Sequence, residues 1–359
     1  MQRNKLSFKG QRIFVGIDVH KRKWSVATIT ESGLQRVHAQ NASAQELIDF
    51  LHRQYPDGDY RAVYEAGFTG FSTYYSLVEV GINCMVIHAA DVPTTQYENV
   101  MKTDKIDCVK LAKSLRAGLL KGIYIRPKDS IDDRGVVRLR RSVIRDASRY
   151  KNRIKHLLMN NGVAIPERFD NRKGGNWSEA FIQWLRGDIG LLSKTRRTLD
   201  LLLDQLERMR QAQLQTTREL RKLSESGAYK RDYDLLRSIP GIGCMVAMTL
   251  LTEIGDITRF SNERQFASYL GLVPTSHSSG DKTTHGEMTF RGNKGISPMM
   301  IEAAWVAIRL DSGLAASYTN YQRKMKPQQA IVRIARKLSN IVFAVLKGKK
   351  KYVPHIPNG

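Results

Sequence analysis

The first third of the chain alternates short apolar runs with amphipathic stretches. Buried β-strands are predicted for three apolar runs, at residues 13–18, 60–65 and 82–87. The alternating segment 24–30 predicts a hairpin partner for the first of these strands. Helices are predicted for three stretches with helical spacing, at residues 44–53, 71–80 and 104–117. Strands that alternate with helices behind an opening hairpin indicate an α/β domain, and the ribonuclease-H-like arrangement is one such architecture.

From residue 128 the pattern changes to long stretches with apolar residues every three or four positions. The first stripe consists of Val136, Leu139, Val143, Ala147, Tyr150, Ile154 and Leu157. The second stripe runs through Leu199, Leu202, Leu206 and Met209, then through the polar residues Gln213 and Thr216, and then through Leu220 and Leu223. Heptad spacing of this kind is typical of long packed helices. Since the Gly-rich polar segment 172–176 separates the stripes, they predict a helical hairpin within one chain or an oligomerising coiled coil.

Residues 230–347 form a third, mainly helical unit. It ends in an amphipathic helix at 331–346, followed by the basic segment 347–351. That basic end is typical of a solvated helix terminus, and a phosphate contact is the alternative. These changes of pattern predict three domains, with boundaries at 1–127, 128–228 and 229–359.

The charge of the chain narrows the class of partner. Among 359 residues, Lys and Arg total 58 and Asp and Glu total 34, giving a formal net charge of +24. This excess favours a polyanion such as nucleic acid. A membrane partner is disfavoured, because no apolar run reaches the roughly 20 residues of a spanning helix. No secretory signal is evident, and the three scattered cysteines fit a reducing cytoplasm.

Four acidic residues stand where a metal site would need them in a basic protein. Asp18 and Glu65 end apolar runs, so they are predicted at strand termini. Asp104 and Asp107 are one helical turn apart and point from the same face. Clustered carboxylates become tolerable at close range when they share a divalent cation, and two such ions could promote phosphodiester displacement. The alternative for the helical pair is a capping and first-turn role at the helix dipole.

Two further patterns indicate contacts with a nucleic-acid backbone. The segment 236–251 predicts two helices joined by a Pro-Gly-x-Gly turn, and Gly241 and Gly243 would expose backbone N–H groups to phosphate. An ordinary tight turn is the alternative. A basic stripe follows one face of the first long helix, through Arg134, Arg138, Arg141, Arg145, Arg149 and Arg153. It predicts a groove for duplex DNA or folded RNA, or else a solvated face.

A small polar loop is predicted at residues 271–282, after an apolar helix. It holds serines, a histidine and an aspartate, but closeness in sequence does not establish triad geometry. A flexible solvated turn is therefore favoured from the residues alone. A serine hydroxyl could still act as a nucleophile if a base or metal lowered its barrier.

Together these segments resemble the DEDD-type insertion-sequence transposases, a family that includes the Piv and MooV DNA invertases. In the first third, the resemblance rests on Gly16-Ile17-Asp18-Val19-His20-Lys21, Glu65-Ala66-Gly67 and the stretch from Lys102 to Ala112. In the last third, it rests on Pro240-Gly241-Ile242-Gly243, the stretch from Phe266 to Pro274, and Ser279-Gly280. The order and spacing of these motifs match over nearly the whole chain.

The resemblance implies a fold and a site. The fold is an α/β ribonuclease-H-like (RuvC-like) N-terminal domain, a helical coiled-coil middle, and a mainly α C-terminal transposase domain with a helix-hairpin-helix. The acids Asp18, Glu65, Asp104 and Asp107 would bind Mg²⁺ or Mn²⁺. Ser279, with Ser278 as the alternative, would attack a DNA phosphodiester and form a phosphoserine link. Lys282 and Arg291 are further expected contacts to nucleic acid.

The resemblance also implies partners. These are donor and target double-stranded DNA, a structured guide RNA encoded by the element, and further copies of the chain in a homodimer or homotetramer. The expected location is the cytoplasm of a bacterium or archaeon, at the nucleoid. Two other hypotheses stay open: a structure-specific nuclease resembling Holliday-junction resolvases, in which the carboxylates activate water, and a non-catalytic nucleic-acid-binding protein.

Overall fold

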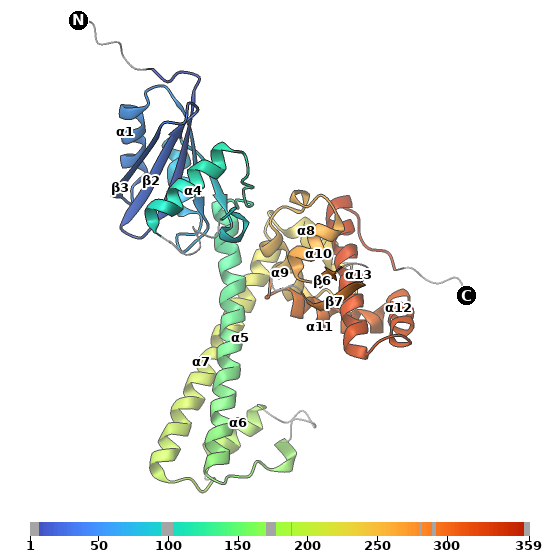
Figure 1. Cartoon of the computed structure of the whole chain (residues 1–359). Helices are drawn as coiled ribbons and strands as arrows, with labels where there is room; N and C mark the ends of the chain where they lie inside the picture. Colours follow the sequence, from blue (N-terminus) through green and yellow to red (C-terminus); the bar gives the residue numbers. More distant parts are fainter. Residues whose placement is uncertain are drawn as a thin grey trace, which may run out of the picture. The chain divides into compact units, whose positions relative to one another are not determined.

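The computed structural model divides into two compact units, Met1–Ile125 and Arg126–Gly359 (Figure 1). It describes residues 7–94, 103–169, 177–187, 189–279, 282–288 and 292–354. For residues 274–279 and 282–288 it describes the backbone alone. Within these ranges, no helix combines the length and apolar character needed to cross a bilayer.

The first unit contains a five-stranded mixed sheet with the strand order β3-β2-β1-β4-β5. Its strands are β1 (Arg12–Val19), β2 (Lys23–Thr30), β3 (Gln35–Asn41), β4 (Asp59–Glu65) and β5 (Asn83–Ile87). The strands β1, β2 and β3 are antiparallel neighbours, whereas β4 runs parallel to both β1 and β5. The predicted strands and the opening hairpin are therefore confirmed. The apolar pattern does not predict β3, because this edge strand is mostly exposed and polar.

Helices cover both faces of this sheet. They are α1 (Ala44–Gln54), α2 (Ser72–Glu79) and α4 (Asp104–Arg116), with a short 3-10 helix η1 (Ala89–Asp91) after β5. Because side chains alternate along a strand, Ile13, Val15 and Ile17 of β1 pack with α1 and α2 on one face. On the other face, Cys108 and Ala112 of α4 pack against β2. The three helices predicted from periodicity are confirmed.

The close approach of α4 to the sheet depends on Gly16. A Cβ atom added at Gly16 would overlap the carbonyl oxygen of Cys108 and lie 2.6 Å from the backbone nitrogen of Ala112. Because both obstacles are backbone atoms of α4, the helix would have to move away from β1. The missing side chain in the middle of β1 therefore sets the distance between strand and helix.

We expect Gly16→Ala to lower the free energy of unfolding by about 2 kcal/mol, the usual cost of overpacking a core. Chemical denaturation of the purified variant measures the change. Gly67→Ala is the matched control, because a Cβ atom there lies 3.9 Å from its nearest neighbour, the carbonyl oxygen of Glu65. Equal unfolding midpoints for the two variants would show that α4 does not press on Gly16.

The second unit begins with two long helices, α5 (Lys128–Asn160) and α7 (Ser193–Ser224), which pack against each other (Figure 1). The 3-10 helix η2 (Glu167–Phe169) and α6 (Glu179–Arg186) lie between them in sequence. Phe169, Phe181 and Leu185 from this connection share a buried cluster with both long helices. A helical hairpin within one chain is therefore present, and assembly of several copies through it stays a prediction.

In each of the two predicted apolar stripes, some of the predicted residues are buried and others are not. On α5, Val143, Ala147 and Ile154 are buried as predicted. Nearer the start of α5, Leu139 is 56% exposed, and the neighbouring Val137 is buried. On α7, Leu203 is buried instead of Leu202. The registers shift because an α-helix turns every 3.6 residues, so its contact face drifts from a strict heptad.

The rest of the second unit is a helical core that includes one hairpin. Its helices are α8 (Lys230–Arg237), α9 (Cys244–Ile254), η4 (Ile257–Arg259), α10 (Glu263–Leu270), α11 (Ser297–Leu310), α12 (Ser312–Gln322) and α13 (Pro327–Gly348). The antiparallel hairpin consists of β6 (Pro274–Ser279) and β7 (Lys282–Met288). The flexible polar turn predicted at 271–282 is therefore wrong: most of it is strand, since main-chain pairing forms the hairpin without an apolar pattern.

Candidate active site

Three elements of the first unit bring the predicted acids together. Asp18 lies near the end of β1, and Glu65 is the last residue of β4, the parallel neighbour of β1. Parallel strands end at the same edge of a sheet, so these two carboxylates share that edge. Asp104 and Asp107 occupy the first turn of α4, whose start is capped by the Thr103 side chain accepting from the Ile106 nitrogen. Thr103, and not Asp104, is therefore the N-cap residue. Asp104 and Asp107 still interact favourably with the positive end of the helix dipole.

The structure adds His20 to this group. Its Nε2 atom is 3.4 Å from Oδ2 of Asp18 and 3.4 Å from Oδ2 of Asp104. One ligand atom from each of these three residues lies within 4.8 Å of the others. The sequence-based site did not include His20. The sequence did contain a signal for it: His20 is two residues after Asp18, and alternate residues of an extended chain point to the same side.

The other three acids all act electrostatically on Asp18. Burial is the largest cause that raises the pKa of Asp18, and the charges of Asp104, Asp107 and Glu65 raise it further. His20 acts in the opposite direction. Asp107 also forms an ion pair with Lys110, whose Nζ lies 3.1 Å from Oδ1 of Asp107. Carboxylates that repel one another in this way gain most from a bound cation.

The donor set fits a hard divalent cation. Carboxylate oxygens are the protein ligands that Mg²⁺ and Mn²⁺ prefer, and Mg²⁺ retains waters and phosphate oxygens beside one or two carboxylates. The Asp104 side chain is 61% exposed, while that of Asp18 is 22% exposed. The candidate site is therefore shielded from solvent at Asp18 of β1 and open to solvent at Asp104 of α4. An external phosphate could complete the coordination of a bound cation from the open side.

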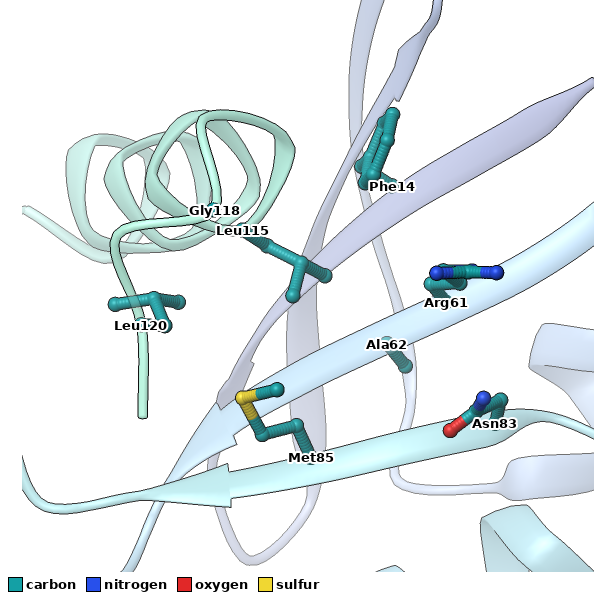
Figure 2. A pocket seen from close by; sticks show the side chains of 8 residues that line it. All are labelled: Phe14, Arg61, Ala62, Asn83, Met85, Leu115, Gly118 and Leu120. Carbon is teal, nitrogen blue, oxygen red and sulfur yellow. The ribbon is translucent and has the colours of Figure 1, made fainter. Parts of the chain in front are cut away.

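Two cavities of the first unit differ in their relation to the acids. One is lined by His20, Lys21 and Phe68 together with hydroxyls from Thr69, Ser72 and Ser76. It therefore adjoins the acid cluster through His20. The other lies beside the last turn of α4, where Leu115 faces Met85 of β5 (Figure 2). Arg61 is its charged lining residue, and no carboxylate lines it, so it does not belong to the acid site.

The predicted serines lie in the second unit, on the β6–β7 hairpin. Ser278 pairs with Thr283, and Ser279 pairs with Lys282 across the hairpin. The structure describes the backbone of both serines. Arg291 lies outside the described residues.

The arginine stripe of α5 divides into two groups. Arg138 pairs with Glu253 of α9, and Arg141 lies against Gly295. Arg145, Arg149 and Arg153 are exposed, and Arg149 pairs with Asp146 on the same helix. Half-buried Arg134 lies among Arg126, Arg138 and Glu253, where burial is the largest cause that lowers its pKa. The stripe is thus partly internal, and its exposed part is available to an external anion.

The Pro-Gly-x-Gly turn joins α8 to α9, and packing explains its first glycine. Gly241 has a φ of +84°, and a Cβ atom there would overlap the carbonyl oxygen of Ala303 in α11. Arg237 donates through Nη1 to the Ile242 carbonyl at 3.0 Å, which closes the turn. Gly243 is the N-cap residue of α9. Phosphate binding by Gly241 and Gly243 stays a prediction.

Comparison with known proteins matches both regions. A family model described as a DEDD transposase of the IS110 type matches residues 15–161, and one described as the transposase IS116/IS110/IS902 family matches residues 233–319. A putative transposase, y4qE, from Sinorhizobium fredii is 27% identical over 81% of this chain and 71% of its own length. The transposase for insertion sequence element IS1111A from Coxiella burnetii is 23% identical, over 78% of this chain and 75% of its own length. The two model matches include the acids and the serine hairpin.

Proposed function

Since the chain belongs to the IS116/IS110/IS902 family of transposases, which cut and rejoin DNA, we propose how its residues divide that work. Asp18, Glu65, Asp104 and Asp107 bind Mg²⁺ or Mn²⁺ in the first unit. A serine of the β6–β7 hairpin attacks the DNA phosphodiester. The observation that supports this best is that ligand atoms of Asp18, His20 and Asp104 lie close enough to share one cation, while the charges of Glu65 and Asp107 also act on Asp18.

The sheet supports a ribonuclease-H-like (RuvC-like) assignment for the first unit. Three antiparallel strands are followed by two parallel ones in the order β3-β2-β1-β4-β5. The acids occupy the ends of the two central strands and a late helix, as that assignment expects. The separate buried clusters of the α5–α7 hairpin and of the helices around α9 similarly support a coiled-coil middle domain and a C-terminal domain.

In the proposed reaction, a serine oxygen attacks phosphorus, the bond from phosphorus to the DNA 3′ oxygen breaks, and the proton lost by the serine is balanced by protonation of the departing oxygen to a 3′ hydroxyl. Ser279 is the first choice for the nucleophile and Ser278 the alternative. The divalent ion, when bound, polarises the phosphate and stabilises charge on the departing oxygen. The product is a phosphoserine ester, which keeps the energy of the broken bond for rejoining the strand.

The excess positive charge supports nucleic-acid partners. The chain has a formal net charge of +24, and Arg145, Arg149 and Arg153 leave one face of α5 basic and exposed. We propose that these arginines contact the sugar–phosphate backbone of donor and target DNA or of a structured guide RNA. Base pairing by that RNA would read the sequence. A homodimer or homotetramer would supply serine and acids from different copies.

The proposal is tested with the protein purified with the RNA from its native locus and a DNA of its insertion site. A protein–DNA adduct that resists denaturation is expected with Mg²⁺ or Mn²⁺, and chelation by EDTA is expected to abolish it. Released nicked DNA without an adduct would instead identify a hydrolytic nuclease. If cleavage and adduct are equally strong in EDTA, the acids hold no catalytic metal.

A further inference from the structure

Glu253 is a buried carboxylate and the one charged residue of helix α9. Its side chain is 2% exposed, so its charge must be matched by partners inside the protein. Arg138 of α5 supplies two charge-assisted hydrogen bonds, from Nε to Oε1 at 2.8 Å and from Nη2 to Oε2 at 3.1 Å. This paired geometry is the strong form of an arginine–carboxylate contact. It ties α5 to the core of the C-terminal helices.

The same carboxylate contacts the segment that follows the β6–β7 hairpin. Asn293 donates through Nδ2 to Oε2 of Glu253 at 3.2 Å. The Asn293 side-chain oxygen in turn accepts from the Gly295 nitrogen at 3.0 Å, which fixes the orientation of the amide. Arg141, one turn after Arg138 on α5, lies against Gly295. Helix α5 therefore connects to the chain just after the hairpin in two ways: Arg138 does so through Glu253, and Arg141 does so directly.

Glu253 also contacts the segment that precedes the hairpin. Its backbone carbonyl accepts a hydrogen bond from the hydroxyl of Tyr269. The Tyr269 carbonyl accepts from the Asn293 nitrogen at 2.9 Å, which joins the two ends of the hairpin segment. The ends touch closely, because a Cβ atom added at Gly292 would overlap the backbone of Gly271. Glu253 thus lies where both ends of the segment meet.

We propose that Glu253 is a positioning residue, which fixes the base of the β6–β7 hairpin and links that hairpin to helix α5. This inference rests on the proposed role of Ser279 or Ser278 as the nucleophile. The exposed arginines 145, 149 and 153 lie on the same helix as Arg138.

The pair remains ionic at neutral pH. Burial raises the pKa of Glu253, but the hydrogen bond from Arg138 and the charges of Arg138, Arg134 and Arg126 outweigh it and lower the pKa overall. The contact therefore stays charged where the protein would work. Replacing the carboxylate by an amide keeps its shape and removes the charge that orients both Arg138 and Asn293.

The experiment uses the full-length variants Glu253→Gln and Asn293→Ala. Backbone hydrogen exchange is measured for strands 274–279 and 282–288, together with DNA affinity and the rate of adduct formation at saturating DNA. We expect at least about tenfold faster exchange in both strands, since a charged hydrogen bond at their base is lost. Adduct formation should slow by about tenfold while DNA affinity changes less than about twofold.

Arg140→Met is the matched control. Arg140 also lies on α5 and is half-buried, but it donates through Nε to Oγ1 of Thr217 in α7 at 2.9 Å. This variant should leave hairpin exchange and adduct rate unchanged.

Unchanged exchange in folded Glu253→Gln and Asn293→Ala would overturn the proposal. So would unfolding of the helices together with the hairpin in both variants, because Glu253 would then be an ordinary core residue. Hydrogen exchange does not depend on the nucleophile. If the hairpin loosens but Ser279→Ala and Ser278→Ala both still form the adduct, the positioning of the hairpin stands and the proposed serine chemistry fails.

Discussion

Ser279→Ala should abolish the covalent protein–DNA adduct. Its rate of formation should fall by at least about 10³-fold, which is the usual size of the effect when a nucleophile is removed. The change removes one oxygen from β6 and leaves backbone pairing with Lys282 intact. DNA binding should therefore stay within about twofold of wild type. The measurement is denaturing electrophoresis of labelled DNA after reaction in Mg²⁺, beside a binding titration at the same salt concentration.

Ser278→Ala is the control, because the two serines are adjacent and Ser278 has its own partner, Thr283. It should keep at least about a tenth of the wild-type rate, because the proposed nucleophile, Ser279, is retained. The reverse result, with Ser278→Ala inactive and Ser279→Ala active, would move the nucleophile by one residue. Free nicked product from Ser279→Ala at the wild-type rate would support the nuclease hypothesis.

Asp18→Asn should lower the rate of DNA cleavage by at least about 100-fold, because loss of a direct metal ligand exceeds the effect of losing a supporting contact. The same variant should be more stable without metal, by about 1 kcal/mol. The folded-state pKa of Asp18 is raised, chiefly by burial and then by neighbouring acids. Its ionised form therefore destabilises the metal-free fold, and this loss of stability develops as pH rises through the raised pKa.

Thermal unfolding at pH 8 in EDTA and in Mg²⁺ measures this second effect. Wild type should gain stability from Mg²⁺, whereas Asp18→Asn should gain little, since it has lost a ligand. Glu31→Gln removes the same charge from an exposed residue in the same unit, and should change stability by less than about 0.5 kcal/mol. A destabilised Asp18→Asn in EDTA would show that its attraction to His20 outweighs the repulsion. Equal cleavage by Asp18→Asn and wild type would show that the acid site does not perform the cleavage. The absence of cleavage in both, with equal DNA binding, would support a non-catalytic nucleic-acid-binding protein.

The sequence predicts most of the first unit because its central strands are buried on both faces. Such strands appear as continuous apolar runs, and acids at their ends stand out. Strand β3 does not stand out, since an edge strand need not be apolar. The approach of α4 to β1 depends on backbone contacts at Gly16, which no periodicity shows.

The second unit is harder to predict from local patterns. The β6–β7 hairpin forms by main-chain pairing in a polar stretch, so its residues appear loop-like. Glu253 offered a signal that the site prediction did not use: a lone charge in the apolar segment 244–254 requires a buried partner. Arg138 is that partner, and an apparent surface stripe therefore includes an internal contact. Spacing along one helix cannot reveal which side chains meet another helix.

The joined ends of the hairpin segment have a structural consequence. Since Gly271 and Gly292 touch, the chain leaves the helical core and returns to it at nearly one point. Replacements or insertions between these glycines need not disturb α10 or α11. A segment of different length or sequence between these glycines can therefore be carried by the same helical scaffold.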